Sequence, residues 1–219
     1  MKLHTAGIGP ISILGAGVFI ILYTLNRYFP EQTFIHYTLY AAALVFMFLV
    51  VRFFRFPERH APQDENTVYS GADGKVVAIE KVHVDEHFNS DRIQVSVFMS
   101  IFNVHINWSP FAGKMIYRRH HPGKHLVAFN PKSSLINEHT SMVIKDEQGR
   151  EVMMRQIAGA VARRIILKSK EGQEVGKGEM IGMIKFGSRI DLILPPDAEV
   201  MVKMGERTKG AQTLIARLK

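Results

Sequence analysis

Two long uncharged segments near the start of the chain constrain its fold more than any other feature. Residues 7–25 and residues 33–51 each form a run of nineteen residues without a charged side chain. At a rise of about 1.5 Å per residue, a helix over either run spans nearly 30 Å, close to the hydrocarbon thickness of a bilayer. The seven-residue linker between them contains Pro30 and is short enough to favour antiparallel helices. The pattern predicts a membrane helical hairpin within residues 1–59.

Charges beside the second run predict which way the hairpin faces. Arg52, Arg55 and Arg59 follow that run closely, and basic residues concentrate on the cytoplasmic side of membrane segments. We therefore expect attachment to the cell (inner) membrane, with the rest of the chain on its cytoplasmic face. Three alternatives stay open: a cleaved signal peptide for the first run, a buried core helix for the second, and a hairpin that dips into the bilayer without crossing it.

Composition narrows the partners that the chain can have. The formal net charge is +8, and a basic protein attracts polyanions such as nucleic acid or anionic lipid. The apolar N-terminus favours the membrane, and we find no recognised nucleic-acid motif. The chain has no cysteine, which excludes disulfides, thiolate zinc sites and cysteine nucleophiles. We expect no metal site, because the histidines match no ligand spacing; those considered are His120, His121, His125 and His139.

Residues 60–219 show the pattern of a mainly β domain. Short apolar runs alternate with Gly, Pro and Asn, and they predict strands over residues 75–80, 93–99, 142–145, 152–157 and 165–168. Residues 172–181 and 205–215 contain two similar motifs that run from Gly to Lys-Gly, here called the glycine motifs. Each motif predicts a strand, a glycine turn and a second strand. Such hairpins resemble those of lipoyl and biotinyl carrier domains, so we expect a barrel-sandwich-hybrid-like fold. They also raise an alternative function, a non-enzymatic membrane-tethered carrier or scaffold with Lys203 as the modified residue.

The pair Gly187-Ser188 lies between two strand-like runs, residues 180–186 and 190–194. A serine after glycine in a tight turn can direct its hydroxyl onto the preceding carbonyl, because glycine tolerates strained backbone angles and offers no side chain in the way. Such an attack leads to an ester, then chain cleavage, and finally a pyruvoyl group at residue 188. An ordinary β-turn is the alternative, since the dipeptide by itself has no specificity.

Several longer segments, in order along the chain, carry a family resemblance. They are residues 53–59 (FFRFPER), 72–77 (ADGKVV), 98–107 (FMSIFNVHIN), 109–113 (SPFAG), 156–164 (QIAGAVARR) and 185–191 (KFGSRID). Together they resemble the short, bacterial-type phosphatidylserine decarboxylase proenzymes.

The resemblance implies a reaction. It implies self-cleavage between Gly187 and Ser188 into residues 1–187 and 188–219, which stay associated, and a pyruvoyl group derived from Ser188. That group forms an imine with the serine headgroup of phosphatidylserine and yields phosphatidylethanolamine and CO₂. The partners implied are a phospholipid, the membrane and, because family members often dimerise, a second copy of the chain.

The resemblance also implies residue roles. Asp73, His105 and Ser188 match a relay that assists self-cleavage, and His105 also suits proton transfer during decarboxylation. Trp108 stands where longer family members carry a second histidine, which leaves open which residue is the base for self-cleavage. Other candidates bind the substrate: Arg163 and Arg164 for the lipid phosphate, and His139, which occupies a position where the family usually has arginine.

Overall fold

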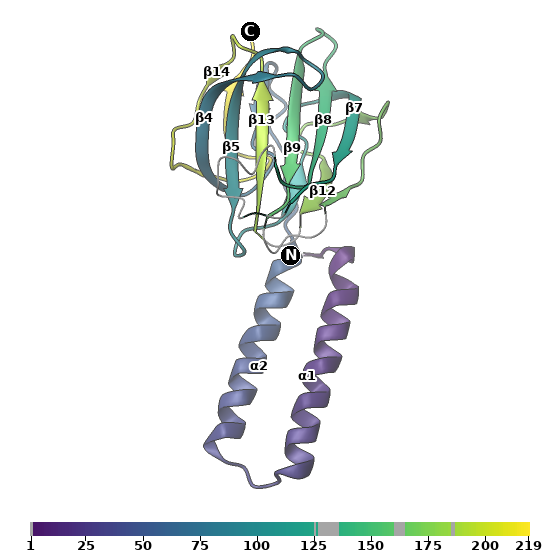
Figure 1. The fold of residues 1–219 in the computed structure, drawn as a ribbon, viewed down its shortest axis with the longest axis vertical. Coiled ribbons are helices and arrows are strands. Elements are labelled where there is room, and N and C mark those ends of the chain that lie inside the picture. The colour runs from purple at the N-terminus through teal and green to yellow at the C-terminus, as the bar shows by residue number, and fades with distance from the viewer. Residues whose placement is uncertain (1, 125, 127–135, 160–164, 185–186) are drawn as a thin grey trace. The chain divides into compact units, whose positions relative to one another are not determined.

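The structure is a computed structural model in which residues 2–124, 126, 136–159, 165–184 and 187–219 are described. The chain divides into two compact units, Met1–Glu58 and Arg59–Lys219. Figure 1 shows the helices of the first unit and the strands of the second. The protein is mainly β with two N-terminal helices, as the sequence predicts.

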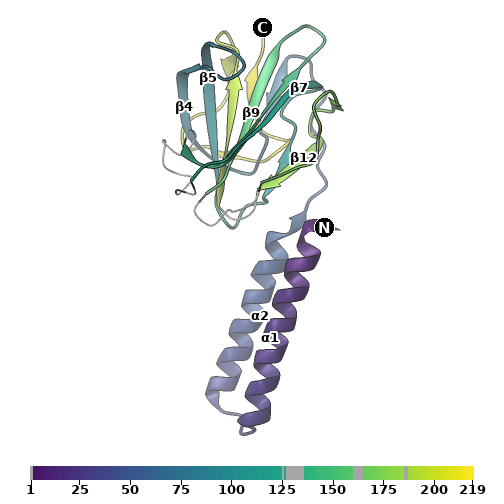
Figure 2. The same cartoon turned by 45° about the vertical axis from the view of Figure 1, so that its right-hand side comes forward.

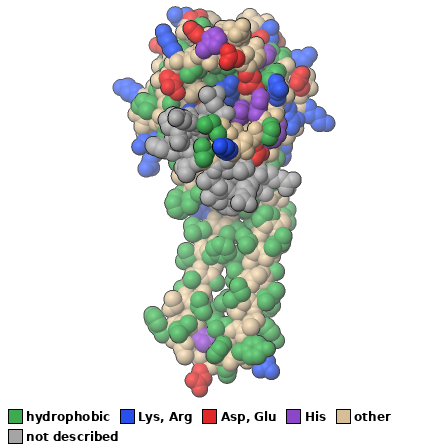
Figure 3. All heavy atoms as spheres, viewed as in Figure 1, with side chains coloured by type: hydrophobic (Ala, Val, Ile, Leu, Met, Phe, Trp, Pro, Cys, Tyr) green, Lys and Arg blue, Asp and Glu red, His purple; other side chains and the backbone are tan. Residues whose placement is uncertain are grey.

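The first unit is a pair of long apolar helices, α1 (Ile8–Tyr28) and α2 (Phe34–Phe53). A short 3₁₀ turn (Thr5–Gly7) precedes them, and β1 (Lys2–Leu3) pairs with β2 (Arg55–Phe56). Both helices are long and apolar enough to cross a membrane. Of the described helix residues only His36 and Phe53 are buried, and hydrophobic side chains cover the visible face of the pair (Figure 3). A core helix would bury its apolar side chains against protein, so the exposure favours a lipid environment.

The turn between the helices explains a histidine inside an apolar run. His36 is the third residue of α2 and forms a capping box with Thr33, in which each side chain reaches the other's backbone N–H. The Nε2 atom of His36 lies 2.9 Å from the Phe29 carbonyl. Tyr40 donates its hydroxyl proton to the Oδ1 of Asn26, at 2.6 Å. These contacts satisfy polar groups that would otherwise face an apolar environment.

The second unit is built around one antiparallel sheet of eight strands. In spatial order the strands are β11 (Glu174–Val175), β7 (Gly113–His121), β8 (His139–Lys145), β9 (Glu151–Ile157), β13 (Ser188–Leu194), β5 (Ser90–Met99), β4 (Gly74–Val84) and β15 (Arg207–Thr208). Two three-stranded sheets complete the unit, β10 (Ile165–Leu167) with β12 (Met180–Ile184) and β6 (Ile106–Trp108), and β14 (Glu199–Val200) with β16 (Leu214–Arg217) and β3 (Thr67–Tyr69).

The large sheet is strongly curled (Figure 2), and the main apolar core contains buried side chains from all three sheets. The five strands predicted from the sequence are confirmed, as β4, β5, β8, β9 and β10. Strand β13 lies near the middle of the large sheet, between β5 and β9. Its seven residues are all buried, so the segment after Gly187 belongs to the most enclosed part of the fold.

The two glycine motifs each form a strand, a turn and a second strand, as predicted. The prediction that the two strands pair as a hairpin is wrong. Strand β11 pairs with β7 and β12 with β6 and β10, whereas β15 pairs with β4 and β16 with β3 and β14. Each glycine motif therefore leads the chain from an edge strand of the large sheet into one of the small sheets. The turn of each motif is hydrogen-bonded to the residue that follows a strand of a small sheet. The Gly178 N–H donates to the Ser109 carbonyl, after β6, and the Ala211 N–H donates to the Ser70 carbonyl, after β3, both at 2.8 Å. Long-range partners, rather than the local turn, decide the pairing.

Candidate active site

Ser188 is the first residue of β13, and its side chain is completely buried. Its hydroxyl donates to the sulfur of Met99, its register partner on β5, at 3.3 Å. Gly187 before it has φ +64°, in the left-handed region that favours glycine. A Cβ at this position would meet no atom within 4 Å, so the backbone conformation, not space, requires glycine here.

His105 is hydrogen-bonded to the backbone N–H of Gly187, one peptide group before the Gly187–Ser188 bond. The Gly187 N–H donates to Nε2 of His105 at 3.2 Å, while Nδ1 lies 3.0 Å from the Asn103 carbonyl. A carbonyl only accepts, so Nδ1 carries the proton and Nε2 presents a lone pair. His105 is completely buried. The structure thus brings together Gly187, Ser188 and a neutral imidazole, which has the form that can accept a proton.

Sequence reasoning missed a chain of three buried side chains, Met99, Asn107 and Gln156, that begins at Ser188. Met99 accepts from Ser188 and also contacts the Nδ2 of Asn107, at 3.8 Å. The Oδ1 of Asn107 accepts from the Nε2 of Gln156 at 2.8 Å. The Oε1 of Gln156 is buried and has no hydrogen-bond partner among the described residues. Asn107 and Gln156 lie inside the segments that carry the family resemblance, which is the one sequence signal that singles them out.

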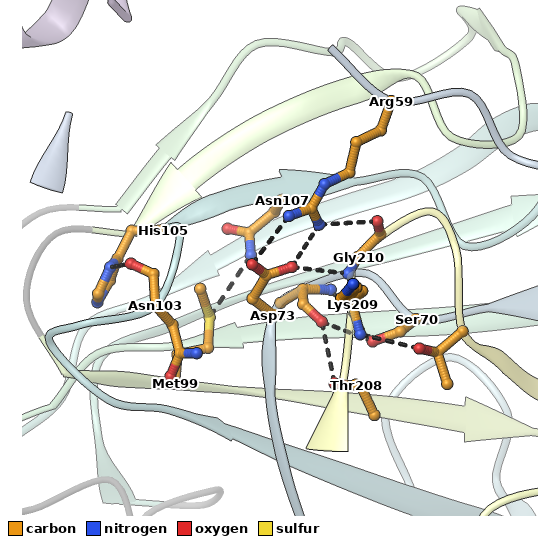
Figure 4. Close-up of polar contacts among 12 residues, drawn as sticks. Arg59, Ser70, Asp73, Met99, Asn103, His105, Asn107, Thr208, Lys209 and Gly210 are labelled. Atoms are coloured by element: carbon orange, nitrogen blue, oxygen red, sulfur yellow. Dashed lines mark hydrogen bonds and ion pairs between the residues drawn. The ribbon is translucent and has the colours of Figure 1, made fainter. Parts of the chain in front are cut away.

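Asp73 lies in a second polar cluster (Figure 4). Arg59 binds both of its carboxylate oxygens, one of them at 3.0 Å, and the Gly210 N–H donates to Oδ1 at 2.9 Å. The Arg59 guanidinium also stacks over Trp108, 4.7 Å from the ring centroid. No described contact of Asp73 reaches His105. The structure therefore places Asp73 with Arg59 and Trp108, and His105 with Gly187.

Trp108, which stands where longer family members have a histidine, is part of this cluster's packing. Its side chain is almost fully buried, and a Cβ at Gly210 would lie 2.3 Å from its ring. Only glycine lets the backbone approach the indole this closely. The glycine in the Lys-Gly pair of the second glycine motif is therefore required by its contact with Trp108.

The remaining predicted residues fall into two groups. Arg163, Arg164 and His125 lie outside the described residues. His139 opens β8, where its ring stacks on His121 at 4.4 Å between centroids. Strand pairing aligns His139 with Ile157 and Ile157 with Arg189. Register partners share a face and neighbours along a strand alternate, so His139 lies on the opposite face of the sheet from the Ser188 side chain.

Comparisons with known proteins identify the class to which this fold and site belong. A sequence model of the phosphatidylserine decarboxylase family matches residues 46–216. Three relatives named phosphatidylserine decarboxylase proenzyme illustrate the similarity. The protein of Cytophaga hutchinsonii is 42% identical over 216 residues, covering 99% of this chain and 98% of its own length. That of Porphyromonas gingivalis is 43% identical over 223 residues, covering 100% and 99%. That of Amoebophilus asiaticus is 50% identical over 169 residues, covering 77% and 75%.

The chain is therefore an enzyme of the decarboxylase class. It belongs to the phosphatidylserine decarboxylase family, which confirms the resemblance found in the sequence. The alternative of a non-enzymatic carrier loses its basis. Lys203 is exposed in the segment between β14 and β15, and its backbone N–H bonds to the Glu206 carboxylate, an arrangement that an ordinary turn accounts for.

Proposed function

We propose that the chain decarboxylates phosphatidylserine to phosphatidylethanolamine, after cleaving itself between Gly187 and Ser188 to form a pyruvoyl group. The observation that carries the proposal is the contact between the Gly187 peptide and the neutral His105, beside a fully buried Ser188. Family membership and the relatives' description as proenzymes support it. The Oε1 of Gln156, which has no partner among the described residues, can accept from an amine, and an amine is what a keto group at residue 188 would bind.

Cleavage would begin with attack of the Ser188 hydroxyl on the Gly187 carbonyl carbon. The C–N bond breaks, an ester forms through Oγ, and residue 188 gains a free amino group. The hydroxyl proton has to leave Oγ, and His105 is the nearby group with a lone pair for it. In the uncleaved chain the serine proton points at Met99. The hydroxyl must therefore rotate, and Nε2 must release the Gly187 N–H, before the attack.

Elimination would complete the cleavage. A base removes the α hydrogen of residue 188, the Cβ–Oγ bond breaks, and Gly187 leaves as a carboxylate that keeps the former serine oxygen. Water then replaces the amino group of residue 188, and ammonia is released. When formed, the pyruvoyl group supplies an electron sink for loss of CO₂ next to an amine. His105, fixed by Asn103, can then hold the proton that the product needs at its α carbon.

Attachment to the membrane is the second part of the proposal. The two apolar helices hold the β unit at a bilayer, so only the lipid headgroup has to enter the protein. Arg52 near the end of α2 and the arginines that follow the helix support a location of the β unit on the cytoplasmic face of the inner membrane. Of the substrate contacts implied by the resemblance, Arg163 and Arg164 stay predictions for the lipid phosphate.

The intact mass of the purified full chain tests the proposal. We expect two species, residues 1–187 and 188–219, the second lighter than the unmodified peptide by one molecule of ammonia. Ser188→Ala should give one uncleaved chain without decarboxylase activity on phosphatidylserine in detergent micelles. Ser90→Ala, at the far end of β5, is the matched control and should be processed normally. Active protein in which residues 187 and 188 remain joined would disprove the mechanism.

A further inference from the structure

Three potential metal ligands meet on the face of the large sheet opposite the Ser188 side chain. His121 and His139 are register partners on β7 and β8, and their rings stack at 4.4 Å with an interplanar angle of 12°. Glu86, in the turn between β4 and β5, places Oε1 2.6 Å from the Nε2 of His121. One ring nitrogen of each histidine and one carboxylate oxygen of Glu86 all lie within 4.8 Å of one another.

The surroundings of His139 keep a ring nitrogen available for a metal. Its Nδ1 lies 2.8 Å from the Asn137 carbonyl, and because a carbonyl only accepts, Nδ1 carries the proton and Nε2 the lone pair. A neutral imidazole fixed by a backbone carbonyl is the usual state of a histidine that binds zinc.

The carboxylate of Glu86 is held in place from its other side. Its Oε2 accepts from Arg155 at 3.0 Å and from the Ser141 hydroxyl at 2.8 Å. Its Oε1 is directed at His121. Oriented carboxylates of this kind are typical of metal sites, whose ligands are fixed by a second layer of hydrogen bonds.

We propose that Glu86, His121 and His139 form a binding site for a divalent transition metal of the zinc class. Two imidazoles and one carboxylate suit Zn²⁺ better than Mg²⁺ or Ca²⁺, which prefer oxygen ligands. The side chains are partly exposed, so water can supply the fourth ligand. Tetrahedral zinc ligands lie about 3.3 Å apart. Zinc would replace the proton between the Nε2 of His121 and the Oε1 of Glu86, which are now 2.6 Å apart and have to separate slightly, and the more distant ligand atoms, all within 4.8 Å of one another, have to move closer.

The site would tie the β4–β5 turn to strands β7 and β8, which gives it a structural role separate from the chemistry at Ser188. Linear spacing hides it: seventeen residues separate His121 from His139, and Glu86 lies on another hairpin. The expectation of no metal site came from that spacing. Strand pairing, which the linear sequence does not display, brings the three side chains together.

Zinc titration of the metal-stripped, untagged full chain in detergent tests the site. We expect calorimetry to show one Zn²⁺ bound per chain, and Co²⁺ to give the visible absorption of a four-coordinate complex. His139→Gln should weaken zinc binding by more than about 100-fold, because it removes a direct ligand. The matched control is His120→Gln. His120 neighbours His121 on β7, so its side chain points to the other face, and zinc binding should not change.

Thermal unfolding separates loss of a ligand from loss of the fold. Zinc should raise the melting temperature of the parent chain and of Ser188→Ala, but not that of His139→Gln or His121→Gln, each compared with its own metal-free melt. Zinc binding by His139→Gln with the parent affinity would overturn the proposal. So would absence of a one-to-one complex in the parent chain, and the cluster would then be a hydrogen-bond network alone. Neither result bears on Ser188, whose processing is read by mass.

Discussion

At the scale of single residues, the structure holds the proposed nucleophile, Ser188, in a resting position. The Ser188 hydroxyl donates to the Met99 sulfur, and the lone pair of His105 is occupied by the Gly187 N–H. The two hydrogen bonds thus engage the proposed nucleophile and the proposed base with other partners. If self-cleavage proceeds as proposed, these two hydrogen bonds have to break first, and each adds to the barrier.

Replacing Met99 with leucine should therefore speed self-cleavage. Leucine has a similar volume, so the fold should tolerate it, but it cannot accept the serine proton. Loss of a resting bond worth about 0.7 kcal/mol corresponds to a roughly 3-fold faster rate. Gel analysis of newly translated protein measures how fast the 188–219 fragment appears. Met115→Leu, a buried methionine elsewhere in the same core, should leave the rate unchanged. A slower Met99→Leu variant would mean that the sulfur positions the serine for attack.

The pairing of Asp73 with Arg59 makes a second residue-scale prediction. Removing either charge leaves a mostly buried partner uncompensated, at a cost of about 3 kcal/mol in folding stability. If Asp73 also supports His105 during cleavage, Asp73→Asn should slow processing at least ~10-fold more than Arg59→Gln does. His105→Gln is the reference variant, and it should slow processing at least ~100-fold. Chemical denaturation and cleavage rates are measured together. Processing that falls only in step with stability in both variants would make Asp73 a purely structural residue.

At the scale of elements, the proposed cleavage point lies at the start of a strand that the fold cannot easily release. Strand β13 bonds to β5 along seven residue pairs and to β9 along five. Further along the same segment, β16 pairs with β3 and β14. On the face opposite Ser188, Arg189 forms a fully buried ion pair with Asp191 at 2.6 Å. A cut before Ser188 breaks none of these contacts.

The two cleaved chains should accordingly stay together until the fold is denatured. In size-exclusion chromatography of the native protein in detergent, the 188–219 fragment should elute with residues 1–187 in equal amounts. In concentrated guanidinium chloride the two should separate, since that denaturant weakens both apolar and peptide contacts. Elution of the small fragment alone from native protein would show that β13 does not hold it.

At the scale of the whole molecule, two forces can bring the chain to a bilayer. The net charge of +8 attracts anionic lipid, but salt screens that attraction. The exposed apolar side chains of α1 and α2 act through the hydrophobic effect, which salt does not weaken. The helical unit should therefore dominate attachment.

Membrane fractions that contain the full chain should retain it through washes with high salt and with alkaline carbonate, and detergent should release it. A helix that spans the hydrocarbon region is effectively irreversibly inserted, whereas an electrostatically bound protein is not. Western blotting of pellet and supernatant measures the partition. Release by salt alone would show that charge, rather than the helices, carries the attachment.

Features whose cause is local follow from the amino-acid sequence alone. Nineteen-residue uncharged runs specify helices α1 and α2, and alternating runs specify strands such as β5. The left-handed backbone conformation before Ser188 is indicated by the glycine at position 187. The family resemblance added His105 and the segments that contain Asn107 and Gln156. In each case neighbouring residues along the chain hold the information, because helix length, strand alternation and turn conformation depend on adjacent positions.

The contacts between residues far apart in the chain became visible in the folded structure alone. The fold places the two strands of each glycine motif in different sheets. It also pairs Asp73 with Arg59 and Trp108, and it places Met99 next to Ser188. It also brings Glu86, in the turn between β4 and β5, to His121 on β7 and His139 on β8. The physical reason is that strand pairing and core packing are chosen by the burial of the entire β unit. A sequence displays the side chains that can interact, and the register of the sheet selects those that do.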